Sequence, residues 1–187
     1  MHNAKMEFAC EKLFKEVKID KHKIQIIDYA CGQGVASVVL LNNLEKLKFP
    51  IDKVNKITLI EPSHIALNRA DYFLHNSSKT TTINKKLDEI IIEDLKTDSK
   101  AVKFHLFSNI LDMGDEEFNI KDIANKIIKS QKGNNYFICV SPREYSKLNK
   151  FMKFFSNYKL IDSSNGISSF HDGKDWQIGY NIFQVEL

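Results

Sequence analysis

Segments of strand length alternate with segments of helical spacing along most of this 187-residue chain. Apolar or β-branched runs predict five strands, at 24–29, 56–61, 80–84, 102–108 and 135–141. Helices are expected before and between them, at 4–18, 33–47, 63–74, near 88–96, at about 120–128 and at 143–155. Strands and helices that alternate in this way predict a mostly parallel sheet covered on both faces.

The end of the chain departs from this alternation. Two further strands are predicted at 158–163 and 177–186, joined by a polar loop, 164–176, with no helix between them. Such a pair is expected to form a hairpin, which places one antiparallel strand in the sheet. We therefore interpret residues 1–187 as a single α/β domain, a three-layer sandwich around a mostly parallel, seven-stranded sheet.

The composition is that of an ordinary globular domain, with 43% hydrophobic and 27% charged residues and a net charge of +3. Only Arg69 and Arg143 are arginines, and the scarcity of the side chain that most often reads phosphates and base edges argues against a dedicated base-reading surface. Cys10, Cys31 and Cys139 form no CxxC pair and no zinc pattern, which fits a reducing compartment. No signal peptide or uncharged apolar run of about 18 residues is visible, so we expect a cytoplasmic protein without a membrane span or metal.

The stretch IIDYACGQG, 26–34, places an acid and a loop of small residues directly after the first strand. In an open parallel sheet, ligands bind beyond the carboxyl ends of the strands, where the strand order reverses. The dinucleotide fingerprint G-x-G-x-x-G, counted from Gly32, would need its third glycine where Ser37 stands, which disfavours a nicotinamide cofactor. A cofactor without a phosphate needs only a tight turn that a sugar and an amino-acid tail can approach closely.

This stretch resembles the first motif of the class I S-adenosylmethionine-dependent methyltransferases, commonly D-x-G-x-G-x-G. Asp28, Gly32 and Gly34 match the motif, and Cys31 is a common occupant of its position. Ala30 stands where the family most often has glycine, which leaves open whether a positive φ is adopted there. The resemblance implies a Rossmann-like fold with the closing hairpin and S-adenosylmethionine as the cofactor.

The resemblance also implies roles at the ends of the other strands. Glu61, at the end of the second strand, would accept hydrogen bonds from both ribose hydroxyls, because an ionised carboxylate has two acceptor oxygens. Leu87 and Asp88, after the third strand, would flank the adenine ring, and Asp88 as a helix N-cap is an equal alternative. The fourth strand would end beside the methionine moiety. The expected cofactor-binding residues are Asp28, Ala30, Cys31, Gly32, Gln33, Gly34, Glu61, Pro62, Leu87, Asp88, Phe107, Ser108 and Asn109.

Several of these residues also have a plain structural interpretation. Asp28 would orient the glycine loop or receive the cofactor's ammonium through water, or it would only cap the following turn. Asn109 and Asp112 are the candidates for substrate contact or a catalytic base, and a strand-end turn and an exposed loop acid are the alternatives. His105 is expected to be a satisfied core histidine, and Cys139 is expected to be packed in the fifth strand.

The resemblance thus implies methyl transfer to an unidentified acceptor, either a small molecule or one delivered by a partner. SNIL stands where adenine methyltransferases carry [DN]-P-P-[YFW], so nucleic acid is not supported, although RNA targets outside that motif stay open. With no large insertion, a substrate lid would have to come from three segments: the helix within 1–20, expected on or near the substrate entrance, the loop 109–119, and the loop with His171 and Asp172. A catalytically idle binding or assembly module is the alternative, and the oligomeric state is left open.

Overall fold

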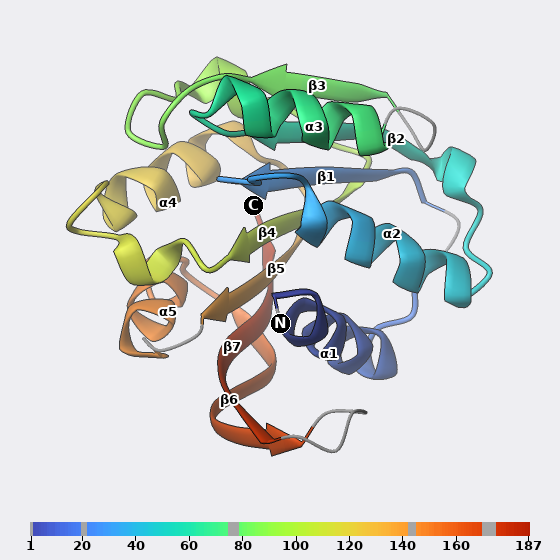
Figure 1. The fold of residues 1–187 in the computed structure, drawn as a ribbon, viewed down its shortest axis with the longest axis vertical. Coiled ribbons are helices and arrows are strands. Elements are labelled where there is room, and N and C mark those ends of the chain that lie inside the picture. The colour runs from blue at the N-terminus through green and yellow to red at the C-terminus, as the bar shows by residue number, and fades with distance from the viewer. Residues whose placement is uncertain (1, 20–21, 75–78, 142–144, 170–174) are drawn as a thin grey trace.

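A computed structural model describes residues 2–19, 22–74, 79–141, 145–169 and 175–187. The described residues form one seven-stranded sheet in the order β3-β2-β1-β4-β5-β7-β6 (Figure 1). Strands β1 to β5 run parallel to one another, and β7 runs antiparallel to both β5 and β6. The strands are β1 (Ile24–Tyr29), β2 (Val54–Ile60), β3 (Thr80–Ile83), β4 (Val102–Ser108), β5 (Asn134–Ser141), β6 (Lys159–Ser169) and β7 (Asp175–Glu186).

Helices cover both faces of this sheet, which confirms the three-layer prediction. One face packs against α1 (His2–Glu16), α2 (Val35–Lys46) and α3 (His64–Leu74), which lie in front of the sheet in Figure 1. The other face packs against α4 (Ile120–Ser130), α5 (Tyr145–Met152) and the 3₁₀ turn η2 (Ile92–Leu95). Two further 3₁₀ turns, η1 (Ile51–Lys53) and η3 (Leu111–Met113), precede β2 and follow β4.

The alternation of side chains along β1 explains how one strand serves both layers. Ile24 and Ile26 belong to the apolar cluster under α1, α2 and α3, whereas Ile27 and Tyr29 belong to the cluster under α4 and α5. All six residues of β1 are buried, as expected for an interior strand of a parallel sheet. The same alternation turns Asp28 toward α2, where it becomes part of the site described below.

A buried polar chain crosses the sheet on the α4–α5 side. The Tyr29 hydroxyl lies 3.0 Å from His105 Nδ1, and His105 Nε2 lies 3.1 Å from Asn135 Oδ1. Because a carboxamide oxygen only accepts, Nε2 carries the hydrogen and Nδ1 accepts from Tyr29. The His105 ring also stacks on Phe137, and burial lowers its pKa to about 3. The prediction of a satisfied core histidine is therefore confirmed, and Cys139 is likewise fully buried.

The structure corrects three sequence-based expectations about secondary structure. The helix expected at 33–47 is α2 (Val35–Lys46), and the apolar residues at every third position from Val35 to Leu47 do not share one face. Val35 and Leu47 are 37% and 55% exposed, while Leu40 and Leu44 are fully buried. A strict three-residue repeat drifts around a helix that has about 3.6 residues per turn. The helix expected near 88–96 is only a turn at 87–89 followed by η2.

The third error concerns the closing hairpin. The segment 164–176 was expected to be a loop because it is polar, yet β6 and β7 pair as far as Ser169 and Asp175. Backbone groups pair whatever their side chains are, so a polar composition does not end an antiparallel ladder. His171 and Asp172 lie outside the described residues.

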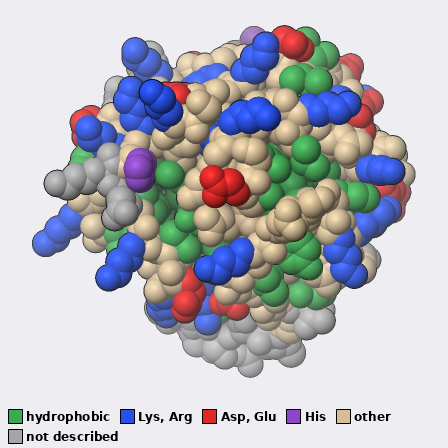
Figure 2. All heavy atoms as spheres, turned by 180° about the vertical axis from the view of Figure 1, so that it is seen from behind, with side chains coloured by type: hydrophobic (Ala, Val, Ile, Leu, Met, Phe, Trp, Pro, Cys, Tyr) green, Lys and Arg blue, Asp and Glu red, His purple; other side chains and the backbone are tan. Residues whose placement is uncertain are grey.

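The surface and helix composition add two observations. Figure 2, which views the molecule from behind, shows lysine and arginine side chains spread over that face, with acidic and apolar ones between them. Among the described residues, no helix combines the length and apolarity that a membrane crossing needs.

Candidate functional site

The polar site lies where the strand order reverses. From β1 the chain proceeds outward to β2 and β3 and then returns to the other side of β1 as β4. The carboxyl ends of β1, β2 and β4 therefore meet at one edge, which lies on the left in Figure 1. A crevice at such a reversal is the usual ligand position in open α/β sheets.

The turn after β1 adopts a left-handed conformation, and backbone hydrogen bonds within it and to β2 hold it in place. Ala30, Gly32 and Gly34 have φ values of 52°, 52° and 77°. The Cys31 N–H donates to Ile60 O at 2.9 Å, and the Gly34 N–H donates to Cys31 O at 2.8 Å. An alanine at positive φ costs roughly 1–2 kcal/mol more than a glycine. Ala30 thus adopts the positive φ that the sequence had left open, and it keeps some strain in doing so.

The two glycines of this turn have different surroundings. A Cβ built on Gly32 would meet nothing within 4 Å, so this glycine borders open space. A Cβ on Gly34 would lie 3.0 Å from the Cβ of Ala70 and 3.2 Å from Leu74 Cδ1. Gly34 is buried at the N-cap of α2, and its close packing against α3 gives it a structural role beside the predicted cofactor contact.

Glu61 joins the end of β2 to the turn after β1. Its Oε2 accepts a hydrogen bond from the Gly32 N–H at 3.0 Å, and its Oε1 accepts one from the Ser63 N–H at 2.9 Å. Asn84, which follows β3, donates from Nδ2 to the carbonyl oxygens of Glu61 and Pro62 at 2.9 and 2.8 Å. Each carboxylate oxygen offers two lone pairs, so Glu61 is oriented and still able to accept two hydroxyl donors.

One carboxylate oxygen of Asp28 caps the first turn of α2, and the two oxygens differ in their hydrogen bonding. Its Oδ2 accepts from the Ser37 N–H at 3.2 Å and from the Ser37 hydroxyl at 2.7 Å, which ties β1 to the first turn of α2. Its Oδ1 is buried and has no hydrogen-bond partner among the described residues. Burial raises the pKa of Asp28 to about 7 against the opposing effect of the Ser37 bonds, and the charge of Glu61 raises it further.

Phe107 and Gln33, which were also predicted near the cofactor, differ in their surroundings. Phe107 is fully buried on the α4–α5 side, where its ring stacks on Tyr29 with centroids 4.3 Å apart, so it belongs to the core. Gln33 is exposed and lines a hollow of about 310 Å³ that also involves Asn3 of α1 and Phe73 of α3. The N-terminal end of α1 therefore lies near the turn, and its position at a substrate entrance stays a prediction.

Cys31, Leu87 and Asp88 differ in how accessible they are. Cys31 is buried, with Sγ 3.6 Å from Gly32 O, and burial raises the pKa of its thiol. Leu87 is 5% exposed, whereas Asp88 is exposed and accepts a hydrogen bond from Lys126 Nζ through its carbonyl oxygen. Asp88 does not cap a helix, because the segment forms only a turn.

The residues after β4 separate the two catalytic candidates. Asn109 directly follows the strand with a φ of 59°, its N–H donates to Val140 O at 2.8 Å, and its Nδ2 lies 3.4 Å from Ser108 Oγ. Since β1 and β4 are paired up to their ends, Asn109 lies at the edge that carries the β1 turn. Asp112 lies in η3 and accepts from Lys147 of α5 through its carbonyl oxygen at 2.6 Å. Of the two candidates, Asn109 is therefore the one that lies at the edge of the β1 turn.

Sequence reasoning did not identify the residues that orient the two acids. Asn84 holds the backbone after β2, and Ser37, which had only counted against the dinucleotide fingerprint, binds Asp28. A serine in the first turn of a helix and an asparagine after a strand were visible signals, because both residue types bond neighbouring backbone or side-chain groups. Their partners are 9 and 23 positions away, so only the fold identifies them.

The strand order β3-β2-β1-β4-β5-β7-β6, with helices on both faces, is the Rossmann-like fold of the class I S-adenosylmethionine-dependent methyltransferases. Solved structures share it. The plantazolicin methyltransferase BpumL in complex with SAH is 13% identical, with a TM-score of 0.59 over 98% of this chain and 82% of that one. A SAM-dependent methyltransferase from Aquifex aeolicus is 12% identical, with a TM-score of 0.57 over 92% and 88%.

The YcgJ protein from Bacillus subtilis is also similar, at 9% identity with a TM-score of 0.59 over 95% of this chain and 97% of that one. No protein-family model matches the chain, and no curated protein matches it. At these identities the likeness establishes the fold, and the activity has to be argued from the site.

Proposed function

We propose that this protein transfers the methyl group of S-adenosylmethionine to an acceptor. The observation that carries the proposal is the hydrogen bond from the Gly32 N–H to Glu61 Oε2. It joins the turn after β1 to the carboxylate after β2 at the reversal of strand order. The fold that this chain shares with BpumL, whose structure holds SAH, supports the same assignment.

Three features of the site fit S-adenosylmethionine. Gly32 borders open space, which leaves room for a sugar against the turn. The carboxylate of Glu61 is fixed by two N–H donors and retains acceptors for the two ribose hydroxyls. Asp28 keeps a buried oxygen without a partner among the described residues, and a cationic ammonium is the group that would satisfy it, directly or through water.

When bound, S-adenosylmethionine supplies an electrophilic methyl group on a sulfonium, so the cofactor carries the hard chemistry. The protein contributes position. Reacting atoms held about 3–3.5 Å apart and in line gain roughly 7–11 kcal/mol at best from proximity and orientation. The rigid turn after β1 would fix the sugar, and Asn109 at the exit of β4 would orient the acceptor. A base is not needed when the acceptor is already nucleophilic.

Titration calorimetry with S-adenosylmethionine and S-adenosylhomocysteine tests the cofactor assignment. Glu61→Gln should weaken both ligands roughly tenfold to a hundredfold, because a hydrogen bond to a charged group contributes roughly 1.5–3 kcal/mol. Glu93→Gln, at an exposed position of η2, removes an acid of the same type away from the site and should leave the affinity unchanged. No binding by the unaltered protein would refute the proposal.

Transfer itself needs a second experiment, in which the protein and S-adenosylmethionine labelled on the methyl group are incubated with fractionated cell extract. Label that enters one fraction identifies the acceptor and should depend on Glu61 as binding does. Tight cofactor binding with no transfer to any fraction would instead favour the idle binding module.

A further inference from the structure

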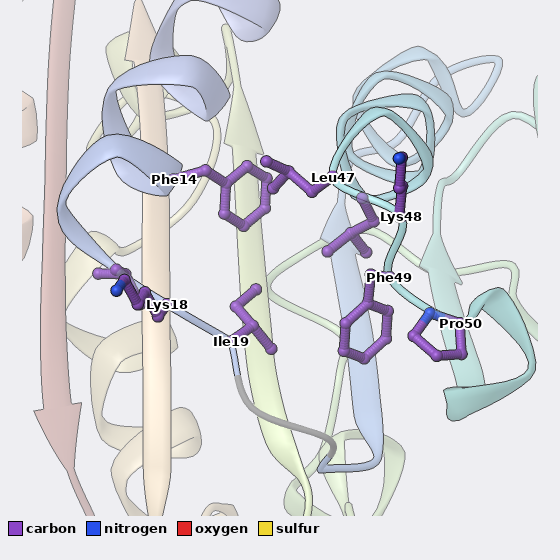
Figure 3. Close-up of a pocket in the computed structure, with 9 residues that line it drawn as sticks. Phe14, Lys18, Ile19, Leu47, Lys48, Phe49 and Pro50 are labelled. Carbon is purple, nitrogen blue, oxygen red and sulfur yellow. The ribbon is translucent and has the colours of Figure 1, made fainter.

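We propose that a second site, at the edge of the sheet opposite the β1 turn, binds an amphipathic anion made of an acyl chain and a carboxylate. The site is a hollow of about 410 Å³ between the C-terminal ends of α1 and α2 (Figure 3). Since α2 begins at the β1 turn and ends at this hollow, the two sites lie at opposite ends of the helix. This inference does not depend on the proposed methyl transfer.

The walls of the hollow are apolar. Figure 3 shows Phe14 and Leu47 pointing toward one another, with Ile19 and Phe49 facing each other below them. Leu47 is 55% exposed, and the other three are only partly buried, so this surface is in contact with water. Covering it releases that water and favours binding. Small-molecule sites have this size and character, roughly 300–1,000 Å³ with apolar and aromatic walls and a few charged groups.

The charged groups of the hollow are cationic. Lys18 and Lys48 are exposed at its two sides in Figure 3, and no acid pairs with either among the described residues. A second hollow of about 240 Å³ shares Phe14 and Leu47 and adds Lys15 together with Glu11. Apolar walls flanked by two lysines are complementary to an acyl chain that ends in a carboxylate.

The backbone at Lys48 provides an independent indication. The Lys48 N–H donates to Glu45 O at 2.8 Å and the Phe49 N–H donates to Leu44 O at 2.9 Å, which is the hydrogen-bond pattern of a Schellman cap. Lys48 occupies the position where glycine is usual, with a φ of 58°, which is strained for a residue with a side chain. Strain that is kept in this way points to a function of the side chain. An ammonium at a helix C-terminus is also favoured by the helix dipole. A binding experiment therefore has to decide whether Lys48 serves a ligand or only the end of α2.

Calorimetric titration with octanoate, decanoate and dodecanoate, each below its micellar concentration, tests the site. Each added methylene should tighten binding about fourfold, because burying a CH₂ contributes about 0.8 kcal/mol. Dodecyltrimethylammonium has the same chain with the opposite charge and should bind about tenfold more weakly or worse. Equal binding of the two head groups, or no dependence on chain length, would overturn the proposal.

Paired variants locate the binding. Lys18→Glu with Lys48→Glu should weaken dodecanoate about tenfold or more. Lys121→Glu with Lys129→Glu, both exposed on α4, changes the net charge equally and should have no comparable effect. Leu47→Gln should reduce the gain per methylene. If the α4 pair acts as strongly as the first pair, the anion is bound by general charge and the site is refuted.

Lys48→Gly separates binding from stability. It removes the ammonium and the strain together, so the melting temperature should rise while dodecanoate binds more weakly. Because the variant is expected to be better folded, weaker binding cannot be attributed to unfolding. A rise in melting temperature with unchanged affinity would overturn the role of Lys48, and the lysine would then serve only the helix end.

Discussion

Asp28→Asn tests whether the acid after β1 is kept for ligand binding at a cost in stability. Its pKa is raised from 3.8 to about 7, a difference of about 3 units, and each unit corresponds to roughly 1.4 kcal/mol. Between these two values the unfolded chain has released the proton while the folded protein still holds it. The contribution of Asp28 to stability therefore falls as pH rises through this window, by about 4 kcal/mol in all.

Asparagine does not titrate, so the variant does not lose this free energy of unfolding as the pH rises. Urea denaturation gives the free energy of unfolding of the variant and of the unaltered protein at each pH. The difference between them, variant minus unaltered protein, should be about 4 kcal/mol more positive near pH 8 than near pH 4. Asp52→Asn, in the exposed turn η1, is the matched control. Asp28→Asn should also weaken S-adenosylmethionine at pH 8, because it removes a partner of the ammonium.

A loss of stability that does not depend on pH would contradict the raised pKa of Asp28. If Asp28→Asn is less stable by the same amount at every pH, then the carboxylate is ionised throughout and its bonds to Ser37 dominate. That result would show that the carboxylate stabilises the fold through Ser37, and the affinity for S-adenosylmethionine at pH 8 would then decide whether Asp28 also contacts the ligand.

Three further predictions follow from the geometry. Ala30→Gly should raise the free energy of unfolding by about 1 kcal/mol, because φ of 52° is unstrained for glycine, and the absence of any gain by urea denaturation would contradict the left-handed turn. Gly34→Ala should lower it by roughly 1–3 kcal/mol, since the new Cβ would lie 3.0 Å from that of Ala70. His105, whose pKa falls from 6.5 to about 3, remains neutral in the folded protein while the unfolded chain gains a proton, so its contribution to stability is complete above pH 6.5 and is lost as pH falls toward 3. Its ring resonances by NMR should show no titration between about pH 8 and 5, and a midpoint near 6.5 would refute the buried chain with Tyr29 and Asn135.

Much of the site was predictable because its residues follow strands directly. A buried strand that ends in an acid and small residues predicted the turn after β1, and the acid after the second strand placed Glu61 beside it. The position of Phe107 was not predictable in the same way. Whether the penultimate residue of a strand faces the core or the crevice depends on the register and pleat of the sheet, and here it stacks on Tyr29 inside the protein.

The sequence by itself determined the alternation of strands and helices, the turn after β1 and the two acids, because periodicity and turn chemistry act between residues close along the chain. Only the tertiary structure decided which groups orient those acids, how far the closing hairpin extends, and that α1 and α2 enclose a hollow at the opposite edge. Those features depend on strand order, register and helix packing, which bring together residues that are distant in the sequence. No local pattern specifies such contacts.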